Sequence, residues 1–328
     1  MAKNNPWYDA SKPHHTPLGF RNLEPGIRTP DALKKWQRER KEQGLPRPPQ
    51  GGYAQFIRDW WQPADFSGSE DAIWWLGHAC LVIRVSGRYL LLDPALGQRA
   101  SPLPFFGPKR KTPLAVSINK LPPIDAVIYS HNHYDHLDKG TLCRLLRRFP
   151  NLQVMAPLGM GEWLEKRGVR TISQCDWWES LDFHGIRLHC VPARHWSMRT
   201  LKDRNRSLWC GWVVESARWR FYFSGDSGYT PGLAEIGQRL GPFDIAALPI
   251  GAYAPEWFMA ESHMSPASAV KVYQELHCPR VIPIHWGVFE LADESLDEPP
   301  QELAQALLTA GVEDPRFIPL KIGARIDI

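Results

Sequence analysis

The chain contains 328 residues, of which 43% are hydrophobic, and it carries a formal net charge of +4 at pH 7. This length and apolar content provide for a large buried core, either in one layered domain or in a domain with an appendage. The charge is only mildly basic, and the densest basic stretch, KKWQRERK at 34–41, predicts a solvated helix or loop face. The composition therefore argues against a nucleic-acid-binding tail, and we expect no nucleic-acid partner.

The cysteines and the amino-terminal residues indicate the cellular compartment in which we expect the protein. The six cysteines, at positions 80, 143, 175, 190, 210 and 278, form no C-x-x-C pair and lie in apolar segments, which predicts reduced, buried thiols. The opening MAKNNPWYDASKPHH lacks the apolar region of a secretory signal, and no apolar run reaches the length of a membrane-spanning helix. We expect a cytoplasmic protein, and peripheral membrane contact stays open.

The sequence changes character near residue 70. Residues 1–70 are rich in Pro, Gly, Trp and charge and show no sustained periodicity. They predict an irregular N-terminal arm packed on the body, with one short helix around 30–42. The tryptophans argue against disorder, because disordered segments contain few aromatic residues. Residues 71–328 are expected to form the main domain.

From residue 71 onward the chain reads as strands joined by loops and helices. AIWWLGHACLVIRV (72–85) and RYLLLDPAL (88–96) predict two strands joined at Ser86–Gly87. IDAVIYS (124–130) is a continuous apolar run, typical of a strand buried on both faces. Further strands are predicted at 152–158, 184–193, 208–216, 218–226, 243–251 and 280–287, and helices at 139–149 and 265–276, the latter with Ser265 as N-cap and Pro266 at its first position. Strands with helices between them predict an α/β layered architecture.

Side chains that bind metals follow four of these apolar runs. They are His131, His133, Asp135 and His136 after the run at 124–130, then His195, Asp226 and His285 after three later runs. In the H-x-H-x-D-H motif, the side chains of alternating residues can face one metal position, and those of the adjacent Asp–His pair can face a second. Imidazole and carboxylate ligands suit zinc, with manganese or iron as alternatives. Seven ligands are more than one tetrahedral ion can bind. They suit two ions that share a bridging carboxylate and lie about 3.5–4 Å from each other.

These motifs resemble a known superfamily. SHNHYDHLD, the later His195, SGDSGY and PIHWG resemble the metallo-β-lactamase superfamily in their order and in their positions after strands. WLGHAC, LLDPAL, FGPKR, DWWE, GPFDIAALPIGAYAPEWFM and IHWGVFELADE narrow the resemblance to N-acyl-phosphatidylethanolamine-hydrolysing phospholipase D and its bacterial relatives, from about residue 71 to the end and more weakly in the arm. The resemblance implies an αββα sandwich for 71–328.

The resemblance also implies residue roles. One zinc would be held by His131, His133 and His195, and the other by Asp135, His136 and His285, with Asp226 bridging them. Tyr134 and His263 would contact the substrate phosphate. The implied reaction is attack of a metal-bridging hydroxide on a phosphodiester, yielding phosphatidic acid and N-acylethanolamine, with Asp135, Asp226 and His263 as catalytic residues. The group that protonates the leaving alcohol stays open.

Several alternatives remain at this stage. Tyr253, Trp257 and Phe289 form either a lipid-facing wall of the substrate site or ordinary core. The arm's Trp7, Trp36, Trp60 and Trp61 either anchor at a bilayer or pack on the body, and His78 is a candidate support for a metal ligand. The rival functions are a lactonase or other small-ester hydrolase, a nuclease of the same superfamily, and a metal-stabilised binding module. A homodimer is also left open.

Overall fold

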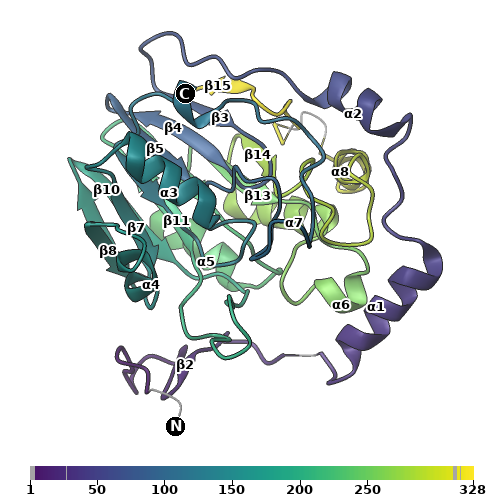
Figure 1. Ribbon diagram of the computed structural model, residues 1–328, viewed down its shortest axis with the longest axis horizontal. Coiled ribbons are helices and arrows are strands. Elements are labelled where there is room, and N and C mark those ends of the chain that lie inside the picture. Colours follow the sequence, from purple (N-terminus) through teal and green to yellow (C-terminus); the bar gives the residue numbers. More distant parts are fainter. Residues whose placement is uncertain (1–3, 27, 313–315, 318) are drawn as a thin grey trace.

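Two mixed β-sheets form the framework of the computed structural model, which describes residues 4–26, 28–312, 316–317 and 319–328 (Figure 1). The first sheet has the order β15–β3–β4–β5–β6–β7–β8, and the second has the order β14–β13–β12–β11–β10–β9. The first comprises β3 (Ala72–Trp75), β4 (Leu81–Val85), β5 (Arg88–Leu92), β6 (Ala126–Ile128), β7 (Gln153–Pro157), β8 (Thr171–Cys175) and β15 (Arg325–Asp327). The second comprises β9 (Ser180–Phe183), β10 (Ile186–Val191), β11 (Gly211–Glu215), β12 (Arg220–Phe223), β13 (Ile245–Pro249) and β14 (Val281–Ile284).

Each sheet is antiparallel in one part and parallel in the other. Strands β5 to β8 are parallel, as are β12 to β14, whereas the remaining neighbours are antiparallel. Parallel neighbours need long crossovers, which helices usually supply. Here β6 and β7 are joined through α3 (Lys139–Arg148), and β12 to β14 through α5 (Gly232–Leu240), α6 (Glu256–Met259) and α7 (Pro266–Leu276). The carboxyl ends of the parallel strands therefore open onto loops rather than tight turns.

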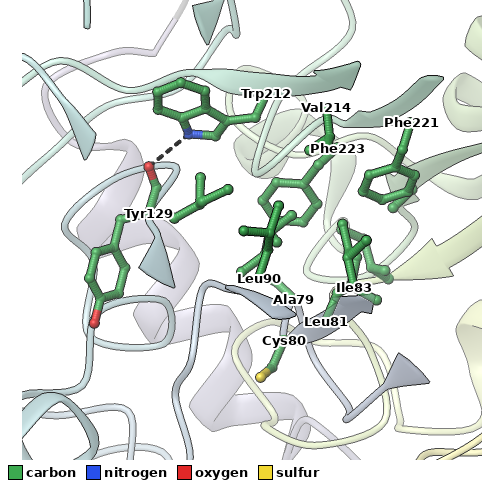
Figure 2. Packing of buried hydrophobic residues seen from close by; sticks show 14 of the residues in the cluster. Ala79, Cys80, Leu81, Ile83, Leu90, Tyr129, Trp212, Val214, Phe221 and Phe223 are labelled. Atoms are coloured by element: carbon green, nitrogen blue, oxygen red, sulfur yellow. Dashed lines mark hydrogen bonds between the residues drawn. The ribbon is translucent and has the colours of Figure 1, made fainter. Parts of the chain in front are cut away.

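The core lies between the two sheets. Phe221 and Phe223 of β12 point toward Leu81 and Leu90 of the first sheet, and all four side chains are fully buried (Figure 2). The indole of Trp212 in β11 donates a hydrogen bond of 2.9 Å to the backbone carbonyl of Tyr129, which directly follows β6 of the facing sheet (Figure 2). Alternate residues of β12 face opposite ways, so Tyr222 stacks on Phe243 instead. This two-sheet arrangement with outer helices confirms the predicted αββα sandwich.

Most predicted elements are confirmed, with shorter strands. The helix predicted at 265–276 is α7, whose N-cap Ser265 accepts a hydrogen bond from the backbone N–H of Ser268, and the helix at 139–149 is α3. The single strand predicted over 72–85 is wrong: the chain turns between β3 and β4, where Gly77 has a φ of 97° and His78 a φ of 55°. The apolar run continues through that turn, so composition did not reveal it.

Some elements carried no clear sequence signal. They are β8, β9, β15, α2 (Gly52–Trp60), α4 (Gly161–Glu165), α8 (Glu298–Thr309), the short 3-10 helix Ile118–Lys120, and the two-stranded β1 (His15–Thr16) and β2 (Gly19–Phe20). The exposed or half-buried residues of β8 and β9 explain two of these omissions, because the expected apolar run is missing there. None of the helices in the described ranges is both long enough and apolar enough to cross a bilayer.

The described part of the arm lies against the body. The predicted helix around 30–42 is α1 (Ala32–Gln43), which contacts α6. The tryptophans of the arm pack inward: Trp36 stacks on Phe258, Trp60 lies edge-on to Trp286, and Trp61 donates to the carbonyl of Pro113. Trp7 is also partly buried against the core. Packing on the body is thus the arrangement found for all four, while the division into domains at residue 70 stays a prediction.

A buried ionic cluster ties the start of the arm to the body. The carboxylate of Asp176, which is 1% exposed, lies 2.6 Å from the ammonium of Lys12 and 2.7 and 2.9 Å from the Nε2 atoms of His14 and His15. Burial by itself would raise the pKa of Asp176, but the hydrogen bonds from His14 and Lys12 hold it well below its usual range. The carboxylate is therefore ionised and is the anchor of the cluster.

Replacing that anchor should loosen the arm. Because Asp176→Ala leaves buried polar partners uncompensated, we expect it to lower the free energy of unfolding by about 3–5 kcal/mol. Urea denaturation measures the loss, and limited proteolysis should show faster cleavage within residues 4–26. Asp182→Ala, on the exposed face of β9, serves as the control and should change stability by less than about 0.5 kcal/mol. An Asp176→Ala variant as stable as the parent would contradict the assigned anchor.

Candidate metal centre

The predicted ligand side chains converge at one edge of the sandwich. The loop between β6 and α3 carries His131, His133, Asp135 and His136, and the loops after β10, β12 and β14 carry His195, Asp226 and His285. Ligands of α/β sheets bind at the carboxyl ends of strands, and all seven side chains lie there. The loop after β6 is short and turned, since the N–H of Leu137 donates to the carbonyl of His133 at 2.8 Å. That turn directs the four side chains toward the second sheet.

Three imidazoles form the first group. The Nδ1 atom of His133 lies 2.9 Å from the Nε2 atom of His131 and 3.1 Å from the Nε2 atom of His195. Three ring nitrogens so close together cannot all be satisfied by one another, because each neutral imidazole has only one donor and one acceptor. They fit instead a cation that accepts all three lone pairs, in the way a His₃ zinc site does.

A carboxylate and two imidazoles form the second group. The Oδ2 atom of Asp135 lies 3.4 Å from the Nε2 atom of His136 and 3.3 Å from that of His285. The Nε2 atom of His78 lies 3.0 Å from the same carboxylate oxygen. His78 therefore contacts a ligand of this group, which is the supporting position that the sequence suggested for it.

Asp226 lies between the two groups. Its Oδ2 atom is 3.0 Å from the Nε2 atom of His285 and 3.1 Å from that of His136, and it is 3.6 and 3.9 Å from the corresponding atoms of His195 and His131. The backbone before it turns at Gly225, whose φ is 60° and where a Cβ would stand 2.7 Å from that of Ser130. A larger residue at this position would push Asp226 out of place.

Polar contacts behind the ligands set which ring nitrogen faces inward. Asp93, which follows β5 and is fully buried, lies 2.7 Å from the Nδ1 atom of His136, and it also accepts the hydroxyl and the backbone N–H of Ser130. The Nδ1 atom of His195 lies 2.9 Å from the carbonyl of Ser262. Such contacts leave the opposite nitrogen, Nε2, free for the metal. The sequence did not single out Asp93, although its position directly after an apolar run is the same signal that marked the ligands.

The electrostatics differ between the two groups. Burial holds the pKa of His131 well below its usual value and lowers that of His133 to about 4 and that of His195 to about 3, so the first group is neutral. Burial also acts on His285, but the carboxylates of Asp226 and Asp135 outweigh it and raise its pKa to about 9. Imidazoles bind metals in the neutral form, so the first group is ready for an ion, whereas an ion bound by the second group would displace the proton of His285.

Unpartnered atoms test whether a metal fits. Within the described residues, both carboxylate oxygens of Asp226 and the Nε2 atoms of His136 and His285 are buried without a hydrogen-bond partner. The short separations from Asp226 thus lack the alignment that hydrogen bonds need. Buried polar groups without partners are rare in folded proteins, and a bound ion can satisfy those that occur. The donor set fits metal ions: the ligand atoms of His131, His133 and His195 lie within 4.8 Å of one another, and so do those of the second group together with His78.

The N-terminal arm holds one ligand in place, which the sequence did not suggest. The side-chain amide of Asn22 donates to the carbonyl of His195 at 2.9 Å and accepts from its backbone N–H at 3.2 Å. The indole of Trp209 donates to the same Asn22 oxygen at 3.1 Å. The arm also reaches the segment before His263, where Arg28 donates to the carbonyl of Phe258. No local pattern marks Asn22, because its partner is 173 residues away in the chain.

A cavity of about 470 Å³ opens onto the two groups. It is lined by His133, Asp135, Asp226 and His263 together with Tyr134 and residues of two loops. The Nδ1 atom of His263 lies 3.9 Å from Asp226, and its ring is 5.1 Å from the rings of both His195 and His285. The hydroxyl of Tyr134 donates to the carbonyl of Arg199 at 2.7 Å, so its ring is held at the cavity wall. Both predicted substrate residues therefore border the cavity.

The three predicted wall residues lie elsewhere. Tyr253, Trp257 and Phe289 are not among the residues that line this cavity. The hydroxyl of Tyr253 donates to Glu298, the Trp257 ring lies under the ammonium of Lys35, and the Phe289 ring packs behind His78. They are close in sequence to His263 and His285, but the chain turns between them and directs their side chains into the body or toward α1. The expected apolar wall is therefore not assembled from these residues.

Comparison with known proteins agrees with this geometry. A family model described as the Beta-lactamase superfamily domain matches residues 88–286. N-acyl-phosphatidylethanolamine-hydrolyzing phospholipase D 1 of Caenorhabditis elegans is 36% identical over 79% of this chain and 77% of its own length. The mitochondrial protein of that activity from Saccharomyces cerevisiae is 32% identical over 75% of this chain and 53% of its own length. An uncharacterised protein of Mycobacterium tuberculosis is 40% identical over 72% of this chain, which spans 63% of that protein.

Solved structures share the fold at lower sequence identity. Igni18, a metallo hydrolase of Ignicoccus hospitalis, superposes with a TM-score of 0.60 at 19% identity, covering 79% of this chain and 98% of its own. An isothiocyanate hydrolase from Delia radicum gut bacteria gives a TM-score of 0.63 at 19% identity, covering 78% and 99%. At this identity the likeness bears on the fold alone, whereas the family match and the curated relatives bear on the chemistry. The chain therefore belongs to the metallo-β-lactamase superfamily, as a metal-dependent hydrolase similar to the N-acyl-phosphatidylethanolamine-hydrolysing phospholipases D.

Proposed function

We propose that the chain is a binuclear metal-dependent phosphodiesterase of phospholipase D type, which hydrolyses N-acyl-phosphatidylethanolamine-like lipids to phosphatidic acid and N-acylethanolamine. The observation that carries the proposal is the position of Asp226, whose carboxylate lies within 3.9 Å of imidazoles from both ligand groups. A carboxylate shared by two ligand sets is the arrangement of two-metal hydrolases. Similarity to relatives that hydrolyse N-acyl-phosphatidylethanolamine supports the lipid diester as substrate.

The ligand roles follow from the two groups. His131, His133 and His195 would hold one ion and Asp135, His136 and His285 the other, with zinc as the proposed metal and manganese or iron as alternatives. Asp226 would bridge them and orient the attacking water. When bound, the ions lower the pKa of that water and offset negative charge on the phosphate.

Residues around the cavity would position the phosphodiester. His263 has an unpartnered Nδ1 atom and lies beside Asp226, so it can reach a phosphate oxygen placed over the two ligand groups. Burial holds the pKa of His263 well below its usual value, which makes it a neutral hydrogen-bond donor rather than an imidazolium. Tyr134 also lines the cavity, and its hydroxyl is fixed by a hydrogen bond to the carbonyl of Arg199.

The bridging role of Asp226 is open to a direct test. Asp226→Asn keeps the shape of the side chain but removes the charge that two ions would share, so phosphodiesterase turnover should fall by at least 10²-fold, on the order of the loss of one electrostatic catalytic group. Elemental analysis should show about two ions per parent chain, as expected of a two-metal hydrolase, and weaker retention of one in the variant. Asp244→Asn, at the opposite ends of the same strands, is the matched control and should keep both ions. Near-normal turnover by Asp226→Asn would show that Asp226 does not bridge.

The role of His263 separates lipid chemistry from the other reactions of the superfamily. A long-chain N-acyl-phosphatidylethanolamine in mixed micelles should be cleaved, and bis-p-nitrophenyl phosphate should be a poor substrate, because binding of the acyl chains helps to position the phosphate. His263→Ala should lower turnover of the lipid by about 10²-fold, as for loss of a group that acts on the transition state, while elemental analysis finds both ions. Loss of an ion would make His263 a ligand, and preference of the parent for a lactone or for RNA would reject the lipid substrate.

The hydrogen bonds between Asn22 of the arm and the backbone of His195 are expected to strengthen metal binding. Asn22→Ala removes both hydrogen bonds to the His195 backbone, and supporting contacts of this kind are worth about 10–100-fold in affinity. One of the two ions should therefore dissociate at a correspondingly lower chelator concentration, as followed by competition with a chromophoric chelator. Arg21→Ala is the control, because the guanidinium of Arg21 donates to the carbonyl of Pro13, within the arm itself. Equal chelator sensitivity of Asn22→Ala and the parent would remove Asn22 from the site.

A further inference from the structure

Two loops beside the cavity carry exposed apolar side chains. The first, residues 99–107, is here called the proline loop and has Phe105 and Phe106 at 75% and 71% exposure. The second, residues 199–204, is called the leucine loop and has Leu201 at 97% exposure. Large apolar side chains exposed in a group, unlike single ones, usually mark a surface that contacts something.

Both loops are held in a defined shape. The proline loop is closed at its base, where the N–H of Ala100 donates to the carbonyl of Pro108 at 3.0 Å. Inside it, the guanidinium of Arg99 donates to the carbonyls of Pro104 and Gly107. In the leucine loop, the carboxylate of Asp203 accepts the backbone N–H groups of Arg199 and Thr200. The apolar tips are therefore presented by ordered loops.

The loops stand at the mouth of the cavity. Pro102 of the proline loop and Leu201 of the leucine loop line it together with Asp226 and His263. A second cavity of about 500 Å³ beside Tyr134 is also lined by both loops. A surface that covers the apolar tips would therefore face the opening through which substrate reaches the ligand groups.

The exposed charge around these tips is positive. The proline and leucine loops together contain four Lys and Arg residues and one Asp, a net charge of +3. The whole chain carries +4, so all the other residues together carry only +1. Lys202 and Arg204 are exposed at the leucine loop, and Lys109 is exposed directly beyond the proline loop. Basic residues around apolar side chains are complementary to an anionic lipid surface, into which apolar tips insert.

We propose that the proline and leucine loops form a docking face for the surface of an anionic phospholipid bilayer. The role of this docking face rests on the proposed function, because docking would bring the mouth of the cavity to the lipid headgroups. A second copy of the chain is the less suited occupant. In a two-fold dimer the same patch meets itself, which would set these positive segments against each other.

Vesicle binding tests the proposal with the full-length, metal-loaded protein. Sedimentation with phosphatidylglycerol vesicles should capture the parent, and capture should weaken with added salt. Phe105→Ser/Phe106→Ser should weaken the apparent affinity at least tenfold while hydrolysis of bis-p-nitrophenyl phosphate is unchanged, since neither ring lines the cavity. Leu308→Ser, which alters a side chain that is 73% exposed on α8, is the matched control and should bind like the parent.

The outcomes are separable from those that test the lipid reaction. Capture of the double variant equal to that of the parent, or equal loss in Leu308→Ser, would overturn the docking face. So would a parent dimer in light scattering that the double variant converts to monomers, since the tips would then contact a second chain. Binding that depends on Phe105 and Phe106 without cleavage of any vesicle lipid would support the docking face and reject the proposed function.

Discussion

The whole structure depends on a set of buried ligand atoms that the protein does not satisfy by itself. Asp226 is 2% exposed, yet neither of its oxygens has a hydrogen-bond partner within the described residues. An ionised carboxylate is very costly to bury unless opposite charge or hydrogen bonds compensate it. The surrounding fold therefore has to keep the imidazoles close to this carboxylate and correctly oriented for cations. Asp93, the carbonyl of Ser262 and Asn22 each hold one of the histidine ligands in that orientation.

The sandwich makes this possible because each ligand group draws on both sheets. The loop after β6 in the first sheet supplies His131 and His133 to one group, and the second sheet completes it with His195. The other group likewise joins Asp135 and His136 to His285. Bound ions would link the two sheets at the carboxyl ends of their strands, so metal binding and packing of the core support each other. The hydrogen bond from Trp212 to the carbonyl of Tyr129 makes a similar link only two residues before His131.

The N-terminal arm belongs to the same unit. Lys12, His14 and His15 attach it through Asp176, and Asn22 and Arg28 continue from there to the loops that carry His195 and His263. The arm also reaches the base of the leucine loop, where the backbone N–H of Phe20 donates to the carbonyl of Asn205 at 2.8 Å. The exposed apolar tips of the proline and leucine loops have little part in the core, so their exposure costs the fold little.

The sequence by itself determined the superfamily, the sandwich and the seven side chains that meet, because these depend on local signals: apolar runs, the H-x-H-x-D-H spacing and polar residues directly after strands. It also determined α7, since Ser265 and Pro266 mark a helix start. Only the tertiary structure decided which distant groups support the ligands, as with Asn22 beside His195. It likewise decided that Tyr253, Trp257 and Phe289 turn away from the cavity while Leu201 lines it. Closeness along the chain does not set the direction of a side chain, because the turns between strands, such as the one at Gly77 and His78, are determined by packing against distant parts of the fold.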